Sequence, residues 1–341
     1  MCKSKTIAVI LCTGLLLAAP AFWYPIFLIK VLCFALFAIA FNLALGVSGL
    51  LSFGHAAFFG GAGYVAAALA RDAAWSFELS VLAGAAYAAV MGLAFGALAV
   101  RRKGIYFAMI TLALAQLVFF AFLQTGYFGG EDGFQGVPRA PLLGVLPLEN
   151  DAVLYYAVLA VCVLMSLLVW RLINSPVGLV LASVRESEAR ALSLGYDADR
   201  YKIFLFTVSA AIAGVAGSMK ALTLGFATLT DIDWRMSGAV ILMALVGGIR
   251  SWYAPAFGAL LVLAVENKVG DLGFWLEKST GIAWFGSLGD SVTIVTGLIF
   301  LVCVQVFRDG VSGLWSSIAG MFNRAGSLLP PASVQEVRNG Q

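Results

Sequence analysis

Residues 26–46 read IFLIKVLCFALFAIAFNLALG, a run of 21 residues in which Lys30 is the single charge. A helix of about 20 apolar residues crosses the ~30 Å hydrocarbon core of a bilayer. Similar runs recur along all 341 residues, which are 62% hydrophobic and 11% charged, whereas soluble domains are ~25% charged. This composition excludes an ordinary water-soluble enzyme and a disordered chain. It predicts an all-α, polytopic membrane protein.

The apolar runs, bounded by charges, glycines or prolines, predict about ten transmembrane helices. The chain then divides into an N-terminal span (1–25), a membrane domain (26–307) with a long inner loop at 173–202, and a tail (308–341). The expected spans are Ile7–Ala21, Ile26–Gly46, Ala56–Ala70, Leu79–Val100, Gly104–Leu123, Ala152–Leu172, Ile203–Leu222, Trp234–Gly248, Trp252–Glu266 and Gly289–Phe307.

Charge is sorted between alternate loops when the N-terminus is placed in the cytoplasm. The inner loops and tails then hold 14 of the 21 Lys and Arg residues and carry a net charge of +8, against −5 outside. Because positively charged loops resist translocation, we expect both termini in the cytoplasm. An alternative for the first span is a signal peptide, since Lys3 and Lys5 precede a short apolar core ending in Ala19-Pro20-Ala21. We expect it to be retained, because no soluble domain follows it.

Groups that drive transport or catalysis are missing from the predicted spans. A residue that binds a coupling ion usually lies mid-membrane, but the few ionisable residues lie near span ends, where long side chains reach the interface; these are Lys30, Lys220, Arg235, Glu266 and Asp290. The chain has no G-x-x-x-x-G-K-[ST] loop and no catalytic pair, and its five cysteines lack metal-like spacing. Uphill transport would therefore need energy from a partner. No basic cluster interleaves with aromatic residues, so we expect no nucleic-acid partner.

A glycine-rich stretch, VSGLLSFGHAAFFGGAGY at 47–64, follows the first quoted run. In a membrane, glycines permit a broken helix whose freed backbone groups line a cavity, and we expect such a break near residues 46–56. The N-terminus of the next helix would offer N–H donors and a positive dipole end to a carboxylate. The alternative is that the glycines only let helices approach closely.

Close packing explains the glycines but not the polar side chains around them. We predict that these, with two polar residues of the apolar span at 104–123, line part of a translocation path; the set is Asn42, Ser48, Ser52, His55, Thr111 and Gln116. The single histidine is more often a satisfied structural group than a proton carrier, and we favour that role for it.

The inner loop at 173–202 contains a predicted amphipathic helix. Ser175 suits the N-cap, Pro176 the first helical position, and Gly195 the C-terminal end. Glu186 stands four residues before Arg190, a spacing that stabilises a helix. The helix could lie on the membrane surface, but its mixed charges favour docking to a cytoplasmic partner. The outer loop at 124–151 carries a net charge of −3 and either meets a soluble partner or caps the outer mouth.

Taken together, these segments resemble the permease family of bacterial branched-chain amino-acid ABC importers, in particular its LivM-type subunits. The likeness covers most of the chain from about Phe41 to Leu314. Glu188-Ala189-x-Ala191-x-x-x-Gly195 also resembles the EAA-type loop through which such permeases engage their ATPases, with Arg190 departing from the pattern. The matching pieces are 42–64, 104–113, 129–138, 175–178, 185–191 with 194–195, 200–202, 245–249 and 308–314.

The resemblance implies an all-helical permease in the bacterial inner membrane, with lipid around it. It pairs with a second homologous permease subunit, two cytoplasmic ATPase subunits and a periplasmic solute-binding protein. ATP is bound by the ATPases, so this chain is no enzyme and needs no cofactor. The implied solutes are branched-chain amino acids; a urea or short-amide permease of the same family and a stand-alone channel are the alternatives. The implied coupling residues are Pro176, Gly178, Arg185, Glu186, Glu188, Ala189, Arg190 and Gly195.

Overall fold

The computed structural model describes residues 19–20, 23–139, 141, 150–280 and 297, without the side chains of 269–280. Within these residues every regular element is a helix, which confirms the predicted all-α class for this part of the chain. The main helices are α2 (Pro25–Asn42), α3 (His55–Asp72), α4 (Phe77–Ala99), α5 (Ile105–Gln124), α6 (Asp151–Ile173), α7 (Pro176–Glu186), α8 (Glu188–Ser193), α9 (Ala198–Leu224), α10 (Trp234–Gly247) and α11 (Ala254–Thr280). Short turns are η1 (Leu43–Val47), η2 (Gly126–Phe128), η3 (Gly130–Asp132) and η4 (Leu229–Asp231).

Every predicted span between residues 26 and 266 corresponds to one of these helices. Five segments of the described chain are long and apolar enough to cross a membrane: α2 with η1, α4, α5, α6 and α9. Helix α10 has 14 residues, which at ~1.5 Å per residue span about 21 Å. The first and last predicted spans lie almost entirely outside the described residues, as does the tail at 308–341, so the count of ten remains a prediction.

Helix α11 differs most from its expected length, because it continues to Thr280 rather than ending at Glu266. The sequence boundary was set by charge, which marks a limit of the hydrocarbon core but not of a helix. Glu and Lys are good helix formers, so the helix passes through Glu266 and Lys268 without a break.

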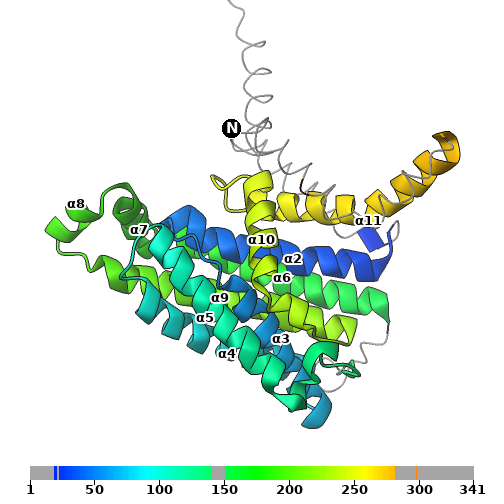
Figure 1. Ribbon diagram of the computed structural model, residues 1–341. Helices are drawn as coiled ribbons and strands as arrows, with labels where there is room; N and C mark the ends of the chain where they lie inside the picture. The colour runs from blue at the N-terminus through cyan, green and yellow to red at the C-terminus, as the bar shows by residue number, and fades with distance from the viewer. Residues whose placement is uncertain (1–18, 21–22, 140, 142–149, 281–296, 298–341) are drawn as a thin grey trace, which may run out of the picture.

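Helices α3, α4 and α9 pack against one another through glycines. A Cβ added to Gly217 of α9 would lie 1.8 Å from the Phe59 carbonyl oxygen of α3, and one added to Gly84 of α4 would lie 2.0 Å from Ser218 Oγ. Lipid offers no hydrophobic drive for helix association, so close backbone approach at small residues supplies it through van der Waals contact. Figure 1 shows these three helices running side by side through the bundle.

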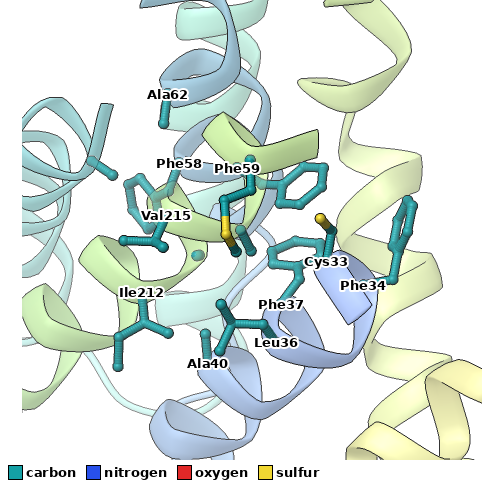
Figure 2. Packing of buried hydrophobic residues seen from close by; sticks show 14 of the residues in the cluster. Cys33, Phe34, Leu36, Phe37, Ala40, Phe58, Phe59, Ala62, Ile212 and Val215 are labelled. Atoms are coloured by element: carbon teal, nitrogen blue, oxygen red, sulfur yellow. The ribbon is translucent and has the colours of Figure 1, made fainter. Parts of the chain in front are cut away.

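Bulky side chains fill the space between α2, α3 and α9. The Phe37 and Phe59 rings stack with centroids 4.3 Å apart, and neither side chain is exposed. Figure 2 shows this pair beside Ile212 and Val215 of α9. Aromatic pairs of this kind add to the free energy gained by burial, and here they fix α2 against the α3–α9 pair.

The loops of the described chain gather at two ends of the bundle. At one end, Phe134 forms a β-bridge with Ala227, and the Arg71 guanidinium lies 3.6 Å from the Phe134 ring centroid. At the other end, Lys103 of the α4–α5 loop forms an ion pair with Glu188 of α8 at 2.7 Å. The α4–α5 loop and the inner loop that carries α8, which the charge pattern places on one side, therefore share one end of the described bundle.

Candidate functional site: the α2–α3 break and the α7–α8 surface

The helix that begins at Pro25 is interrupted before α3. After α2 the chain forms the π-helical turn η1, and residues 49–54 adopt no helix before α3 begins at His55. Gly49 has φ = 73°, in the left-handed region that glycine adopts without a steric penalty. Ser48 Oγ donates to the Ala44 carbonyl oxygen at 2.7 Å, which closes the last turn.

Protein side chains satisfy the backbone N–H groups of the break. Phe53 N–H donates to Thr111 Oγ1 at 3.2 Å, and Gly54 N–H donates to Ser52 Oγ at 3.0 Å. At the first turn of α3, Ala56 N–H donates to Ser237 Oγ of α10 at 2.9 Å. In this conformation, three of the donors expected to face a solute are bound internally.

The glycines further along the stretch pack against neighbouring elements. A Cβ on Gly60 would lie 2.6 Å from the Asp231 carbonyl carbon, and one on Gly61 would lie 2.7 Å from the Tyr87 ring. Close packing therefore explains the glycines after His55, while the lining of a solute path by freed backbone groups stays a prediction. The residues before His55 interrupt the helix, and those after it allow close packing.

His55 is fully buried and holds α3 against α2 and α9. Ser209 Oγ donates to the Ala40 carbonyl oxygen at 2.5 Å, so it accepts the His55 Nε2–H bond at 3.0 Å. The Phe41, Phe58 and Phe206 rings meet the imidazole edge-on at 5.1–5.6 Å between centroids. This setting fits a structural role, but the histidine is not fully satisfied as expected, because the buried Nδ1 has no hydrogen-bond partner among the described residues.

The remaining predicted path residues lie on two helices: Asn42 ends α2, and Thr111 and Gln116 lie on α5. Asn42 is 4% exposed, and its Nδ2 donates to the Ser251 carbonyl oxygen at 3.2 Å. Thr111 is fully buried, whereas Gln116 lies half-buried on α5. The part that any of them plays in a path stays a prediction.

The predicted amphipathic helix of the inner loop is two helices rather than one. As predicted, Ser175 caps α7, with its Oγ accepting from Gly178 N–H at 3.4 Å, and Pro176 occupies the first turn. The prediction of one helix continuing toward Gly195 is wrong, because Ser187 is extended (φ = −156°, ψ = 97°) and separates α7 from α8.

The split removes the predicted pairing of Glu186 with Arg190, which now belong to different helices. Gly195, at φ = 87°, still forms the left-handed end expected of a glycine. Gly178 has a separate role, because a Cβ there would lie 2.1 Å from the Ile173 carbonyl oxygen. Its small size permits the sharp turn from α6 into α7.

Glu188 is held by two lysines of the same chain. Its Oε2 lies 2.7 Å from Lys103 Nζ and 3.2 Å from Lys202 Nζ. The hydrogen bond from Lys103, with Lys202 beside it, holds the pKa of the Glu188 carboxyl below its usual value. Glu188 therefore fastens α8 to the α4–α5 loop and to α9, while Ala189 and Arg190 remain exposed.

The segment before the break and helix α7 meet at a cavity of about 710 Å³. Arg185 Nη1 of α7 donates to the Gly46 carbonyl oxygen of η1. Asn42, Arg185 and Glu186 all line this cavity, together with the turn between α10 and α11. The sequence presented these residues as two separate sites, and only the fold brings them together.

One buried ion pair was missed from the sequence. Lys220 was expected to reach the membrane interface, but it is 8% exposed and its Nζ lies 2.5 Å from Asp231 Oδ1, itself 5% exposed. The expectation was wrong because α9 continues to Leu224 and η4 then folds back, which places Asp231 beside Lys220. Thr228 Oγ1 also donates to Asp231 Oδ2, at 3.0 Å.

The described residues contain no cluster of His, Cys, Asp or Glu that could hold a metal ion.

Long apolar helices packed through glycines, with charged loops gathered at both ends, define a multi-pass membrane protein. Residues 25–307 match the family described as "Branched-chain amino acid transport system / permease component". The chain belongs to this family of transport permeases.

Three relatives are similar over part of the chain. High-affinity branched-chain amino acid transport system permease protein LivM of Escherichia coli K12 is 27% identical over 261 residues, which cover 70% of this chain and 61% of the relative. The protein of the same name from Salmonella typhimurium LT2 is 26% identical over the same shares. The probable branched-chain amino acid transport permease protein LivM of Methanocaldococcus jannaschii is 26% identical, over 57% of this chain and 58% of that protein. The chain thus spans about 61% of the first relatives' length. No solved structure matches it.

Proposed function

We propose that this chain is a transmembrane permease subunit of an ABC importer and forms part of the path for branched-chain or related amino acids. Its membership of the permease family supports this function. The Asp, Glu, Lys and Arg residues of the five apolar segments described all lie near helix ends, and the buried Lys220 is paired with Asp231. These segments therefore offer no unpaired mid-membrane charge for a coupling ion. ATP would be hydrolysed on separate subunits, and this chain would hold no cofactor.

The partners that fit are a second homologous permease, two cytoplasmic ATPase subunits and a periplasmic solute-binding protein. The end of the bundle with α7 and α8 would face the cytoplasm. Its described loops and helix ends hold nine basic against four acidic residues, and positive loops stay inside. We therefore propose that both termini lie in the cytoplasm and that the chain lies in the bacterial inner membrane.

The proposed coupling mechanism rests on the hydrogen bond that Arg185 donates to the Gly46 carbonyl oxygen. Arg185 lies on α7, on the surface where an ATPase would dock, and its guanidinium holds a carbonyl of the interrupted helix. Closure of the ATPases would displace α7. Because Arg185 joins α7 to η1, that displacement would move the segment that carries Asn42 and Ser48, and alternating access would follow.

Reconstituted transport tests the function and the solute together. Proteoliposomes that contain the permease pair, the ATPases and the binding protein are given labelled leucine or labelled urea, with and without ATP. We expect ATP-dependent accumulation of leucine only. Accumulation of urea would reassign the solute, and flux through liposomes holding this chain alone without ATP would show a channel.

Cross-linking tests the docking surface. Glu188 is unsuitable for this purpose, because its substitution would also release α8 from Lys103 and Lys202. A cysteine at exposed Ala189 should cross-link to an ATPase subunit. A matched cysteine at exposed Glu131, at the opposite end of the bundle, should not. Equal cross-linking at both positions would refute the proposed orientation.

A further inference from the structure

The cavity beside α7 has the size and the mixture of groups found in small-molecule sites. Its volume of about 710 Å³ falls within the ~300–1,000 Å³ typical of ligand pockets. Its walls come from four parts of the chain: α7, the end of α2 with η1, the end of α6, and residues 249–253 between α10 and α11. It therefore lies where α7, which belongs to the proposed docking surface for an ATPase, meets the end of α2 with η1.

Polar groups of opposite character line this cavity. Arg185 and Glu186 supply a guanidinium and a carboxylate from successive positions of α7. Asn42 is 4% exposed, and its Oδ1 accepts no hydrogen bond within the described part of the chain. That oxygen is itself inaccessible to solvent, so it lies behind the cavity wall rather than facing the space.

Apolar side chains complete the lining. Val47 of η1, Ile173 at the end of α6, Leu179 of α7 and Trp252 all border the same space. An aliphatic side chain placed against them would be removed from water, which is favourable in proportion to the apolar area buried. The cavity thus offers a cation, a carboxylate acceptor and an apolar wall.

We propose that this cavity binds a free zwitterionic amino acid with an aliphatic side chain, which enters from the side of α7. The identity of the solute rests on the proposed function. The Arg185 guanidinium binds the carboxylate, and the Glu186 carboxylate accepts from the ammonium group. A guanidinium has five N–H donors, so Arg185 can hold the ligand and the Gly46 carbonyl together. Occupancy would then be sensed by the contact that joins α7 to η1.

A segment of an ATPase subunit is the other occupant to consider, because α7 belongs to the proposed docking surface. The small molecule is favoured by the pairing of a guanidinium with a carboxylate beside an apolar wall. This set matches both ends of one zwitterion. The protein alternative becomes an outcome of the test.

Direct binding to the full-length chain in lipid nanodiscs, without the solute-binding protein, tests the site. Labelled leucine is the probe, and competition is measured with 4-methylpentanoate, which lacks the ammonium group, and 3-methylbutylamine, which lacks the carboxylate. We expect Arg185→Gln to weaken binding of leucine and 4-methylpentanoate by about tenfold or more, a loss typical of one charge-assisted contact. Binding of 3-methylbutylamine should be unchanged by this substitution.

Glu186→Gln should give the reverse pattern, weakening leucine and 3-methylbutylamine but not 4-methylpentanoate. This second variant keeps the test decisive if Arg185→Gln fails to fold. The matched control is Arg102→Gln, an exposed arginine of the α4–α5 loop that does not line the cavity.

Two results would overturn the proposal: no leucine binding to the wild-type chain, or equal loss in Arg102→Gln and Arg185→Gln. If the ATPase protects Trp252 fluorescence from quenching by solvent and leucine does not, the cavity belongs to the protein partner instead. The uptake experiment is independent of these results. ATP-driven leucine uptake without leucine binding here would refute the site and leave the proposed function standing, whereas failed uptake would refute the function.

Discussion

The buried Lys220–Asp231 pair allows a quantitative prediction about stability. The two side chains are 10% and 6% exposed, and the Lys220 Nζ lies 5.9 Å from the Phe34 ring centroid. Replacing Asp231 with leucine would leave an ammonium group buried without its counter-ion. Breaking a buried pair in this way costs about 3–5 kcal/mol. A loss of 1 kcal/mol lowers the melting temperature of domains of 150–250 residues by about 2–4 °C, so we expect a decrease of at least about 6 °C.

The double variant Lys220→Met with Asp231→Leu separates this reasoning from a simple packing defect. Replacing both members of a buried pair with apolar residues is often neutral or stabilising, so the double variant should recover most of the loss. Melting is followed in detergent by the fraction of monodisperse protein that survives heating.

This prediction is refuted by the order of the melting temperatures of the wild type and the two variants, not by any single value. If Asp231→Leu has the same melting temperature as the wild type, the Lys220 ammonium group is not buried as the structure places it. If the double variant is no more stable than Asp231→Leu, the cost arises from lost shape complementarity around η4 rather than from an unpaired charge.

Further predictions concern the helix packing and the α8 attachment. Gly217→Ala forces a Cβ to within 1.8 Å of a backbone oxygen, so it should lower the melting temperature by several degrees, as overpacking costs ~1–3 kcal/mol. Gly238→Ala, in α10 with nothing within 4 Å, should not. Glu188→Gln should speed hydrogen exchange in α8, while Arg190→Gln, which breaks no ion pair described for α8, leaves it unchanged. Because the pKa of Glu188 is lowered on folding, its contribution persists above the ordinary Glu value of ~4.3 and is lost as pH falls below it. A nitroxide on Ala189→Cys should therefore become mobile only in acid, and should show no such transition when combined with Glu188→Gln.

Sequence patterns predicted the helices well where the pattern was local. Ser175 and Pro176 defined the start of α7 because a cap and a fixed φ act within one turn. The split at Ser187 was not predictable in the same way. The amphipathic pattern continues across it, and Glu188, directly after the split, is bound by Lys103 and Lys202, which lie on other elements.

The candidate site was predicted in its parts and not in its arrangement. Asn42 and Arg185 were both selected as polar or charged residues in informative segments. Their shared cavity joins positions far apart in the chain, since Arg185 and Gly46 are separated by 139 residues. The serines that bind the first turn of α3, Ser209 and Ser237, gave no signal, because a serine in an apolar helix looks the same whichever neighbour it binds.

The sequence by itself determined that the chain is helical and membrane-embedded, which loops lie at a common end of the bundle, and where glycine interrupts the helix after Gly46. Hydropathy, charge and backbone freedom are properties of short segments, so they can be read without knowledge of the fold. Only the tertiary structure decided that Asp231 meets Lys220, that Ser209 meets His55, and that α7 is tied to the interrupted helix. Those contacts depend on how closely α3, α4 and α9 pack and on the angles at which the helices cross, and such distances are set by all the neighbouring helices together.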